Sequence, residues 1–177
     1  MPSDDESGPW TRGPLRITGS ALATIRAHAE REHPREACGW LVGPAEPWDL
    51  LDEACAGVNE ADRYHALDPE QFPRTSRDYF RLSNKDFNRA RRAGSEARRP
   101  VKVVYHSHCD SQREGFPAGD YFSAEDAETF AREGRLWVPC AFVVVGVVAG
   151  RALGQRLWVH RPGTNAFDEQ ALVLVES

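Results

Sequence analysis

The chain has 177 residues, of which 41% are hydrophobic and 28% charged, a balance typical of a soluble globular domain with one core. Its formal net charge of −5 argues against nucleic acid as a partner, because nucleic-acid-binding domains carry a basic surface. No apolar run is long enough to span a bilayer, no secretory signal peptide is recognisable, and the four cysteines form no CxxC pair. We therefore expect a cytoplasmic protein with no membrane partner.

The first part of the chain alternates predicted strands and helices. The polar, acidic residues 1–13 predict a disordered leader, so a single domain is expected over residues 14–177. Hydrophobic periodicity and turn residues then predict a short strand at Leu15–Ile17 and a helix capped by Ser20 that extends to Glu32. A buried strand at Ala37–Val42, a less regular strand at Trp48–Val58 and a long polar loop at Glu60–Arg77 are expected after them.

The second part of the chain is richer in strands. A short extended piece precedes a helix that Ser83 opens and that ends near Gly94. A central strand at Val101–Tyr105, a loop at Cys109–Phe122 and a helix at Ser123–Glu133 are predicted next. Three further strands are expected at Pro139–Val148, Gln155–His160 and Ala171–Val175. This mixed order predicts an α/β or α+β fold in which helices flank a mixed β-sheet.

The central strand runs into the triplet His106-Ser107-His108. Residues two apart on a strand point to the same face, so both imidazoles could aim at one point. Two histidines near a loop are by themselves more often polar surface than metal ligands. A carboxylate from the next element would complete two His plus one acid, the composition of a catalytic zinc site with a position left for water.

Ser123 and Asp126 open the helix that follows the loop. Their spacing is typical of a capping box, and Ser83 and Asp86 show the same pattern. The local pattern alone therefore favours a structural role. In the functional interpretation, the first turn of this helix brings Asp126 over the end of the central strand, facing the imidazoles, and Ser123 lies beside the open position.

A catalytic zinc site also needs a group that handles protons. Glu36 is the candidate, because it lies directly before the predicted buried strand Ala37–Val42. A carboxylate that does not bind the metal can take the proton of the attacking water. The alternative is a solvated glutamate at a helix–strand turn after Pro34.

Three segments together resemble the JAMM metalloprotease family (MPN+, Mov34/PAD-1, JAB): Glu36-Ala-Cys-Gly-Trp-Leu-Val-Gly43, His106-Ser-His108 and Ser123-Ala-Glu-Asp126. Two further segments resemble its compact prokaryotic branch: Tyr79-Phe-Arg-Leu-Ser-Asn-Lys-Asp86 and Gly119-Asp-Tyr-Phe-Ser123. The resemblance extends from about Leu15 to His160. It implies a twisted mixed sheet flanked by helices, with layering like that of cytidine deaminase. It also implies Zn²⁺ held by His106, His108 and Asp126, Glu36 as the general acid/base, and Ser123 as a hydrogen-bond donor to the oxyanion.

The activity implied by the resemblance is hydrolysis of the amide bond after the C-terminal Gly of a ubiquitin-like protein, in deconjugation or precursor processing. One alternative is release of a C-terminal adduct, such as cysteine, from a sulfur-carrier protein, and another is a non-catalytic scaffold. The implied partner is a protein with a C-terminal Gly tail, with E1- and E2-like proteins encoded nearby. The PCxxC signature of zinc deaminases is absent, and a cysteine hydrolase built on Cys109 and His106 lacks an orienting residue.

Two features depart from the family pattern. The loop Cys109–Phe122 is longer than usual, and we expect its extra piece, roughly Ser111–Gly119, to extend outward beside the site without moving Asp126. Cys109 stands where many members carry Pro. We expect it to be a small buried residue at a turn of the chain, the alternative being a thiol that reaches the zinc or is oxidised.

Overall fold

A computed structural model describes residues 8–176, and a six-stranded mixed sheet lies at its centre. The strand order is β10-β9-β8-β5-β2-β4. Neighbouring strands are antiparallel except β5 and β8, which are parallel. The strands of this sheet are β2 (Cys38–Val42), β4 (Glu53–Ala56), β5 (Val101–Cys109), β8 (Ala141–Val148), β9 (Arg151–His160) and β10 (Phe167–Gln170). The predicted α+β class with a mixed sheet is confirmed.

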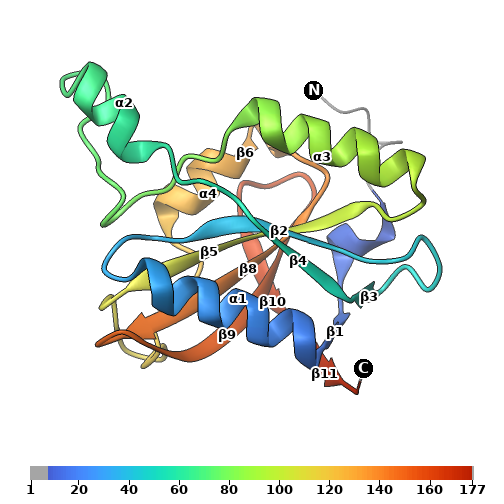
Figure 1. Ribbon diagram of the computed structural model, residues 1–177. Coiled ribbons are helices and arrows are strands. Elements are labelled where there is room, and N and C mark those ends of the chain that lie inside the picture. The colour runs from blue at the N-terminus through green and yellow to red at the C-terminus, as the bar shows by residue number, and fades with distance from the viewer. Residues whose placement is uncertain (1–7, 177) are drawn as a thin grey trace.

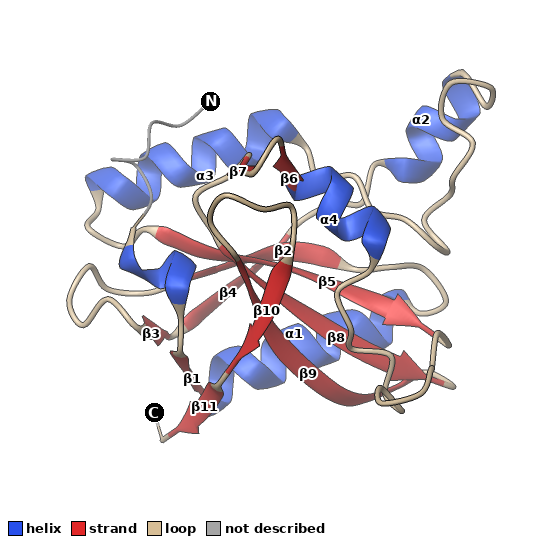
Figure 2. Ribbon diagram, turned by 180° about the vertical axis from the view of Figure 1, so that it is seen from behind, coloured by secondary structure: helices blue, strands red, loops and turns tan. Residues whose placement is uncertain are grey.

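Helices cover both faces of this sheet. The helices are α1 (Gly19–Glu32), α2 (Ala61–Leu67), α3 (Asn84–Glu96) and α4 (Ala124–Phe130). Helix α1 packs on one face, while α3 and α4 lie across the other, and α2 projects beyond the edge of the sheet (Figures 1 and 2). Two smaller sheets complete the described part: β11 (Leu172–Val175) with β1 (Leu15–Thr18) and β3 (Leu50–Leu51), and the hairpin of β6 (Ala131–Arg132) and β7 (Arg135–Leu136).

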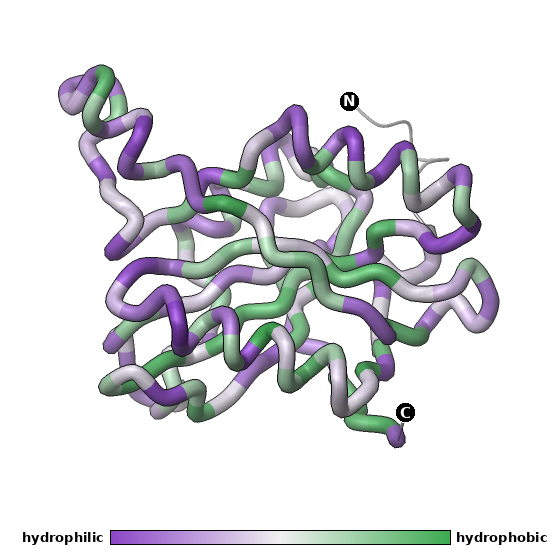
Figure 3. Tube along the Cα trace, in the orientation of Figure 1, coloured by the Kyte–Doolittle hydropathy of each residue, from purple (hydrophilic) through white to green (hydrophobic). Residues whose placement is uncertain are grey.

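The hydrophobic core is divided by the sheet into two clusters. Alternate residues of β5 supply both, since Val103 and Tyr105 face α1 whereas Val104 faces the α3 side. Strands β5 and β8 are buried along almost their whole length, which explains the apolar sequence of β8 and of most of the first half of β5. Figure 3 shows hydrophobic stretches among the strands at the centre of the molecule. The position of any side chain on β5 is therefore tightly fixed.

Ordered structure begins earlier than the sequence predicted. Residues 1–7 of the expected disordered leader lie outside the described residues. Pro9–Arg12 forms a short 3₁₀ helix (η2), and the Trp10 indole N–H donates to the carbonyl of Pro139 at 2.8 Å, so this part of the prediction is wrong. Helix α1 is also capped two residues earlier than expected, by the Thr18 hydroxyl, which accepts from the amide of Ala21.

The predicted loop Glu60–Arg77 contains helix α2, which the sequence analysis missed. Seven residues are too few for a helix that is stable by itself, so the local pattern is weak and tertiary contacts decide. Other boundaries differ as well: β5 continues through the two histidines to Cys109, and the expected strand Trp48–Val58 is divided into β3 and β4. Helix α4 ends at Phe130, before the hairpin, β9 begins at Arg151, and the polar edge strand β10 had no apolar alternation to reveal it.

Within residues 8–176, none of the helices combines the length and the apolar character that crossing a membrane requires.

Candidate metal centre

The candidate ligand atoms converge at the end of β5. The Nε2 atoms of His106 and His108 lie 3.2 Å apart. One carboxylate oxygen of Asp126 lies 3.1 Å from Nε2 of His106, and the other lies 3.2 Å from Nε2 of His108. All three side chains are buried, and one ligand atom from each lies within 4.8 Å of the others. The residues predicted from sequence as metal ligands are thus brought together.

Burial and mutual contact set the charges of these three groups. Burial lowers the pKa of His106, which favours the neutral imidazole that binds metals. Burial acts in the same direction on His108, but its contacts with Asp126 and the charge of Glu36 outweigh this and raise its pKa. For Asp126, burial alone would raise the pKa, yet the two imidazoles hold it well below the usual range. Asp126 is therefore available as an anionic ligand.

The loop after β5 orients His108. The ring nitrogen Nδ1 of His108 lies 2.9 Å from the carbonyl oxygen of Gly119, so Nδ1 carries the proton and Nε2 keeps a free lone pair. Gly119 has φ +82°, and Gly146 on β8 leaves room for the loop, since a Cβ there would come within 2.0 Å of the Ala118 oxygen. The end of the loop therefore packs onto the sheet and contacts a ligand, whereas residues 112–115 are exposed. The prediction that this piece extends outward is confirmed for its middle and wrong for its end.

His106 is held differently. Its ring stacks on Phe80, with 4.4 Å between ring centroids and 21° between ring planes. Its Nδ1 atom has no hydrogen-bond partner within residues 8–176, although it is buried. The ring is therefore oriented by packing rather than by a hydrogen bond, and its Nε2 atom faces Asp126.

Asp126 is both a capping residue and a candidate ligand. The Ser123 hydroxyl accepts from the amide of Asp126 at 3.0 Å, and the Asp126 carboxylate accepts from the amide of Ser123 at 2.9 Å. The two interpretations of this motif are thus compatible, because a carboxylate oxygen has lone pairs for both partners. Since the Ser123 hydroxyl acts here as an acceptor, its own proton is still free to be donated.

Glu36 is buried beside the same site, with 6% of its surface exposed. It precedes Ala37, whose amide donates to the Ser107 hydroxyl at 2.8 Å and whose carbonyl accepts from the Ser107 amide at 3.0 Å. Ser107 lies between the two histidines, so this double contact fixes Glu36 next to them. Burial raises the pKa of Glu36 to about 8, His108 lowers it and Asp126 raises it further. The alternative of a solvated turn residue is therefore wrong, because Glu36 is buried.

Asn59 was missed by the sequence analysis. Its side-chain amide donates to the carbonyls of Glu36 and Tyr79, and its side-chain oxygen accepts from the amides of Ala61 and Arg81. These four bonds join the backbone of Glu36 to both ends of the segment that contains α2. An Asn two residues before a helix is a recognisable capping signal, but its bond to Glu36 has no local signature.

Cys109 lies on the opposite side of β5 from the histidines, since neighbouring side chains alternate. It is half-buried, and its thiol donates to the carbonyl of Arg35 at 3.4 Å. Burial raises its pKa to about 11, which keeps it a thiol. Among the described residues, the group that could hold a metal does not include it.

Two imidazole nitrogens and one carboxylate oxygen are a donor set that suits Zn²⁺. The structure fits this ion in a second respect, because the second nitrogen of His108 is bonded to a backbone carbonyl, as is usual for a metal-binding histidine. The three ligands come from one strand and one helix terminus, both of which are well packed. The site is therefore a preorganised candidate metal centre.

Curated proteins that are similar to the chain include peptidases. The CysO-cysteine peptidases of Mycobacterium tuberculosis and Mycobacterium bovis are 32% identical to the chain over 104 residues, which cover 59% of this chain and 60% of the relative. The chain thus matches less than two thirds of the length of these relatives.

Solved structures share the fold. A protein of Desulfitobacterium hafniense superimposes with a TM-score of 0.64 at 19% identity, covering 93% of this chain and 94% of that chain. A protein of Salinibacter ruber gives a TM-score of 0.57 at 24% identity, covering 91% and 92%. A family model described as prokaryotic homologs of the JAB domain matches residues 18–160. The chain belongs to this prokaryotic JAB family.

Proposed function

We propose that the chain is a zinc-dependent peptidase that hydrolyses the amide bond after the C-terminal Gly of a small carrier protein, releasing a C-terminal cysteine. The observation that carries the reaction class is the convergence of His106, His108 and Asp126 beside the buried Glu36. The relation to the CysO-cysteine peptidases favours a sulfur-carrier substrate. Deconjugation of a ubiquitin-like protein, and E1- or E2-like partners, stay predictions from the family resemblance.

Zinc held by the two histidines and Asp126 would polarise the substrate carbonyl and make water a stronger nucleophile at neutral pH. Glu36 takes the proton from the attacking water. Burial raises the proton affinity of the Glu36 carboxylate above that of an exposed carboxylate, while a cation bound beside it favours the ionised form that accepts a proton. The protonated Glu36 then gives the proton to the leaving nitrogen, so the carboxylate is restored.

The Ser123 hydroxyl donates a hydrogen bond to the oxygen of the tetrahedral intermediate. The capping bond with Asp126 fixes the position of the hydroxyl while leaving its proton free. The amide of Ser123 is at the same time bonded to Asp126. Ser123 therefore couples the position of a ligand to the position of the oxyanion donor.

The test is a cleavage assay on a purified carrier protein that ends in Gly-Gly-Cys, with release of cysteine followed by mass spectrometry. Glu36→Gln removes the proton acceptor but none of the three ligands. We expect it to keep bound zinc and to lower kcat by about 10²–10⁴-fold, the usual contribution of a general acid/base. A chelator should abolish cleavage by the wild type, and added zinc should restore it.

Parallel substrates separate the alternatives. Cleavage of a carrier joined to a lysine side chain, with no cleavage of the cysteine adduct, would favour deconjugation. Wild-type protein that folds without zinc and cleaves neither substrate would favour the scaffold. If Glu36→Gln cleaves at the wild-type rate, the assigned proton path is wrong.

A further inference from the structure

A groove lies beside the candidate metal centre, between α2, α3 and the segment after β7. Its cavity volume is about 850 Å³. Its floor is apolar and includes the buried rings of Phe80, Phe87 and Phe130, together with Val104. Trp137 stands at its side with 42% of its surface exposed, which is high for so large an apolar side chain. The groove can therefore receive an apolar group.

The rim of the groove is basic. Arg63, Arg81, Lys85 and Arg91 line it, against one carboxylate, Glu60, which pairs with Arg63 at 3.6 Å. The other three cations form no ion pair within residues 8–176. This local excess of positive charge stands out because the chain as a whole has a net charge of −5. Such a surface attracts an acidic partner.

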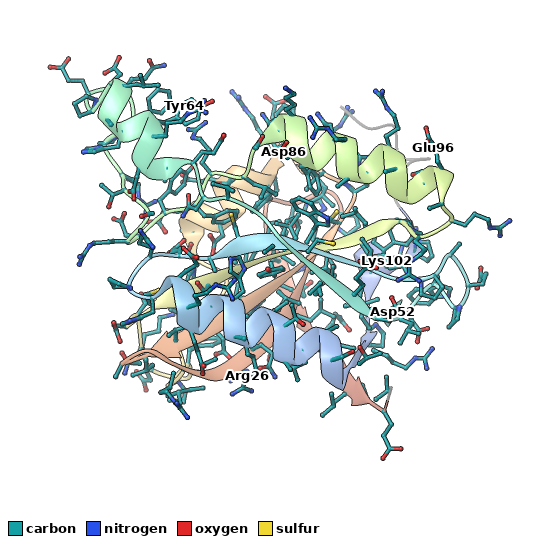
Figure 4. All side chains as sticks on the ribbon, viewed as in Figure 1. Arg26, Asp52, Tyr64, Asp86, Glu96 and Lys102 are labelled. Carbon is teal, nitrogen blue, oxygen red and sulfur yellow. The ribbon has the colours of Figure 1, made fainter. Side chains whose placement is uncertain are left out.

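Arg81 is held in place by aromatic contacts. Its guanidinium lies 4.6 Å from the ring centroid of Tyr64 and 4.9 Å from that of Phe72. Tyr64, labelled in Figure 4, thus links the projecting helix α2 to the rim of the groove. Because Arg81 is already ordered, less entropy is lost when it binds an anion.

The groove is next to the candidate metal centre. Phe80 in its floor stacks on the ring of His106, and Thr129 on its wall follows Asp126 by about one turn of α4. A second cavity of about 490 Å³ shares Arg81 and Thr129 with the groove and reaches Glu125, the neighbour of Asp126. A protein bound in the groove would therefore have its tail within reach of the metal site.

We propose that this groove docks an acidic surface of the protein substrate, with an apolar side chain seated against Trp137 and carboxylates paired with Arg81, Lys85 and Arg91. The inference rests on the proposed function, since it makes the occupant the body of the carrier whose tail is cleaved. The groove supplies affinity for the folded carrier, while the metal centre acts on the tail.

The first experiment measures docking without catalysis. A fluorescein-labelled peptide of alternating acidic and apolar residues is titrated with the Glu36→Gln protein and followed by fluorescence anisotropy. A peptide with Lys in place of the acids and a single-stranded DNA of equal charge are titrated in parallel. We expect the acidic peptide to bind, more weakly at higher ionic strength, and the basic peptide not to bind. Tighter binding of DNA than of the acidic peptide would overturn the proposal.

Charge variants locate the site. We expect Lys85→Glu to weaken binding of the acidic peptide by about tenfold. This change is safe for folding, because Lys85 lies in the exposed first turn of α3, where an acid is favourable. Arg81→Gln and Trp137→Ala should weaken binding as well. The matched control is Arg31→Glu on α1, across the sheet, which should leave binding unchanged.

The second experiment links the groove to the substrate. In the wild-type background, Lys85→Glu should raise KM for the folded carrier by about tenfold at unchanged kcat, and should leave cleavage of a short Gly-Gly-Cys peptide unaffected. Equal effects on carrier and short peptide would overturn the docking role. If the wild type cleaves neither, the proposed function fails, and the anisotropy titration alone decides whether the groove binds acidic protein.

Discussion

The two ends of β5 both carry buried polar side chains, yet they differ in how those side chains are satisfied. At one end, Lys102 is fully buried and its ammonium donates to the carbonyls of Pro44 at 2.7 Å and Leu50 at 2.9 Å (Figure 4). At the other end, His106 and His108 direct lone-pair atoms at one another and at Asp126. Lys102 thus joins a loop to the sheet, whereas His106, His108 and Asp126 form a cluster of candidate metal ligands.

The difference between Lys102 and the two histidines shows that burial of a polar group does not by itself indicate function. Lys102 has donors that match nearby acceptors, so its surroundings are complete. The histidines bring three acceptors together, an arrangement that repels unless a cation or protons stand between them. A buried cluster of hydrogen-bond acceptors is therefore a better indication of a functional site than a single buried polar group. Variants at the two ends of β5 should accordingly behave differently.

The largest expected effect is that of Asp126→Asn at the metal end. The amide oxygen can still accept from the Ser123 amide, so the helix start is kept, but the anionic ligand is lost. We expect zinc affinity to fall by more than about 100-fold, the upper range for residues that merely support a ligand, and cleavage to become undetectable. Metal analysis and the cysteine-release assay measure both. Retained zinc at wild-type affinity would contradict the ligand assignment.

Ser123 caps helix α4 at the candidate site, whereas Ser83 caps helix α3 away from it, so variants of the two serines can be compared. Ser83 and Ser123 each accept from the amide of the Asp three residues later. Replacing either by Ala should cost about 1 kcal/mol of unfolding free energy. Only Ser123→Ala should also lower kcat, by about 10²–10³-fold, because it alone removes an oxyanion donor. Denaturant titrations and kcat values give the two readouts, and equal kcat values for the two variants would remove Ser123 from the mechanism.

The smallest expected effect on activity is that of Lys102→Met at the other end of β5. Two buried carbonyls would lose their donor, so we expect the free energy of unfolding to fall by about 1–3 kcal/mol. Zinc content and kcat should stay at the wild-type values. A loss of zinc in a folded Lys102→Met protein would mean that the two ends are coupled.

The same variant provides a test of pH dependence. Burial lowers the pKa of Lys102 from 10.5 to about 8. Between these values the unfolded chain binds a proton that the folded chain does not, so the unfolding free energy of the wild type rises with pH, by at most about 1.4 kcal/mol per unit. Relative to Lys102→Met, the wild type should gain stability as pH rises from about 8 to about 10.5. A constant difference across this window would contradict the lowered pKa.

Elements with a strong repeating pattern could be predicted from the sequence. The apolar runs of β5 and β8 and the capped helices α1 and α3 lie close to where they were expected. Helix α2 could not be predicted, because its seven residues depend on the bond from the Ala61 amide to the Asn59 side chain and on the contact of Tyr64 with Arg81. Strand β10 is polar and forms only by pairing with β9.

The residues of the candidate site could also be predicted only in part. Glu36, His106, His108, Ser123 and Asp126 could be selected because three short motifs occur in order along the chain. The groups that orient them could not, since the carbonyl of Gly119 is a backbone atom and carries no sequence identity. The packing of the longer loop onto β8 depends on close approach at Gly146, which is visible only in three dimensions.

Asn59 has a consequence for how this protein can vary. Its side chain joins both ends of the segment containing α2 to the backbone of Glu36. A second contact comes from within the segment, where the Ser76 carbonyl accepts from the Glu36 amide at 2.6 Å. Insertions, deletions or exchanges between residues 63 and 75, which lie between the members of the Asp62–Ser76 contact, can change what the protein recognises while the backbone of Glu36 stays in place. Asn59 and Ser76 together thereby allow the surface around α2 to vary separately from the candidate site.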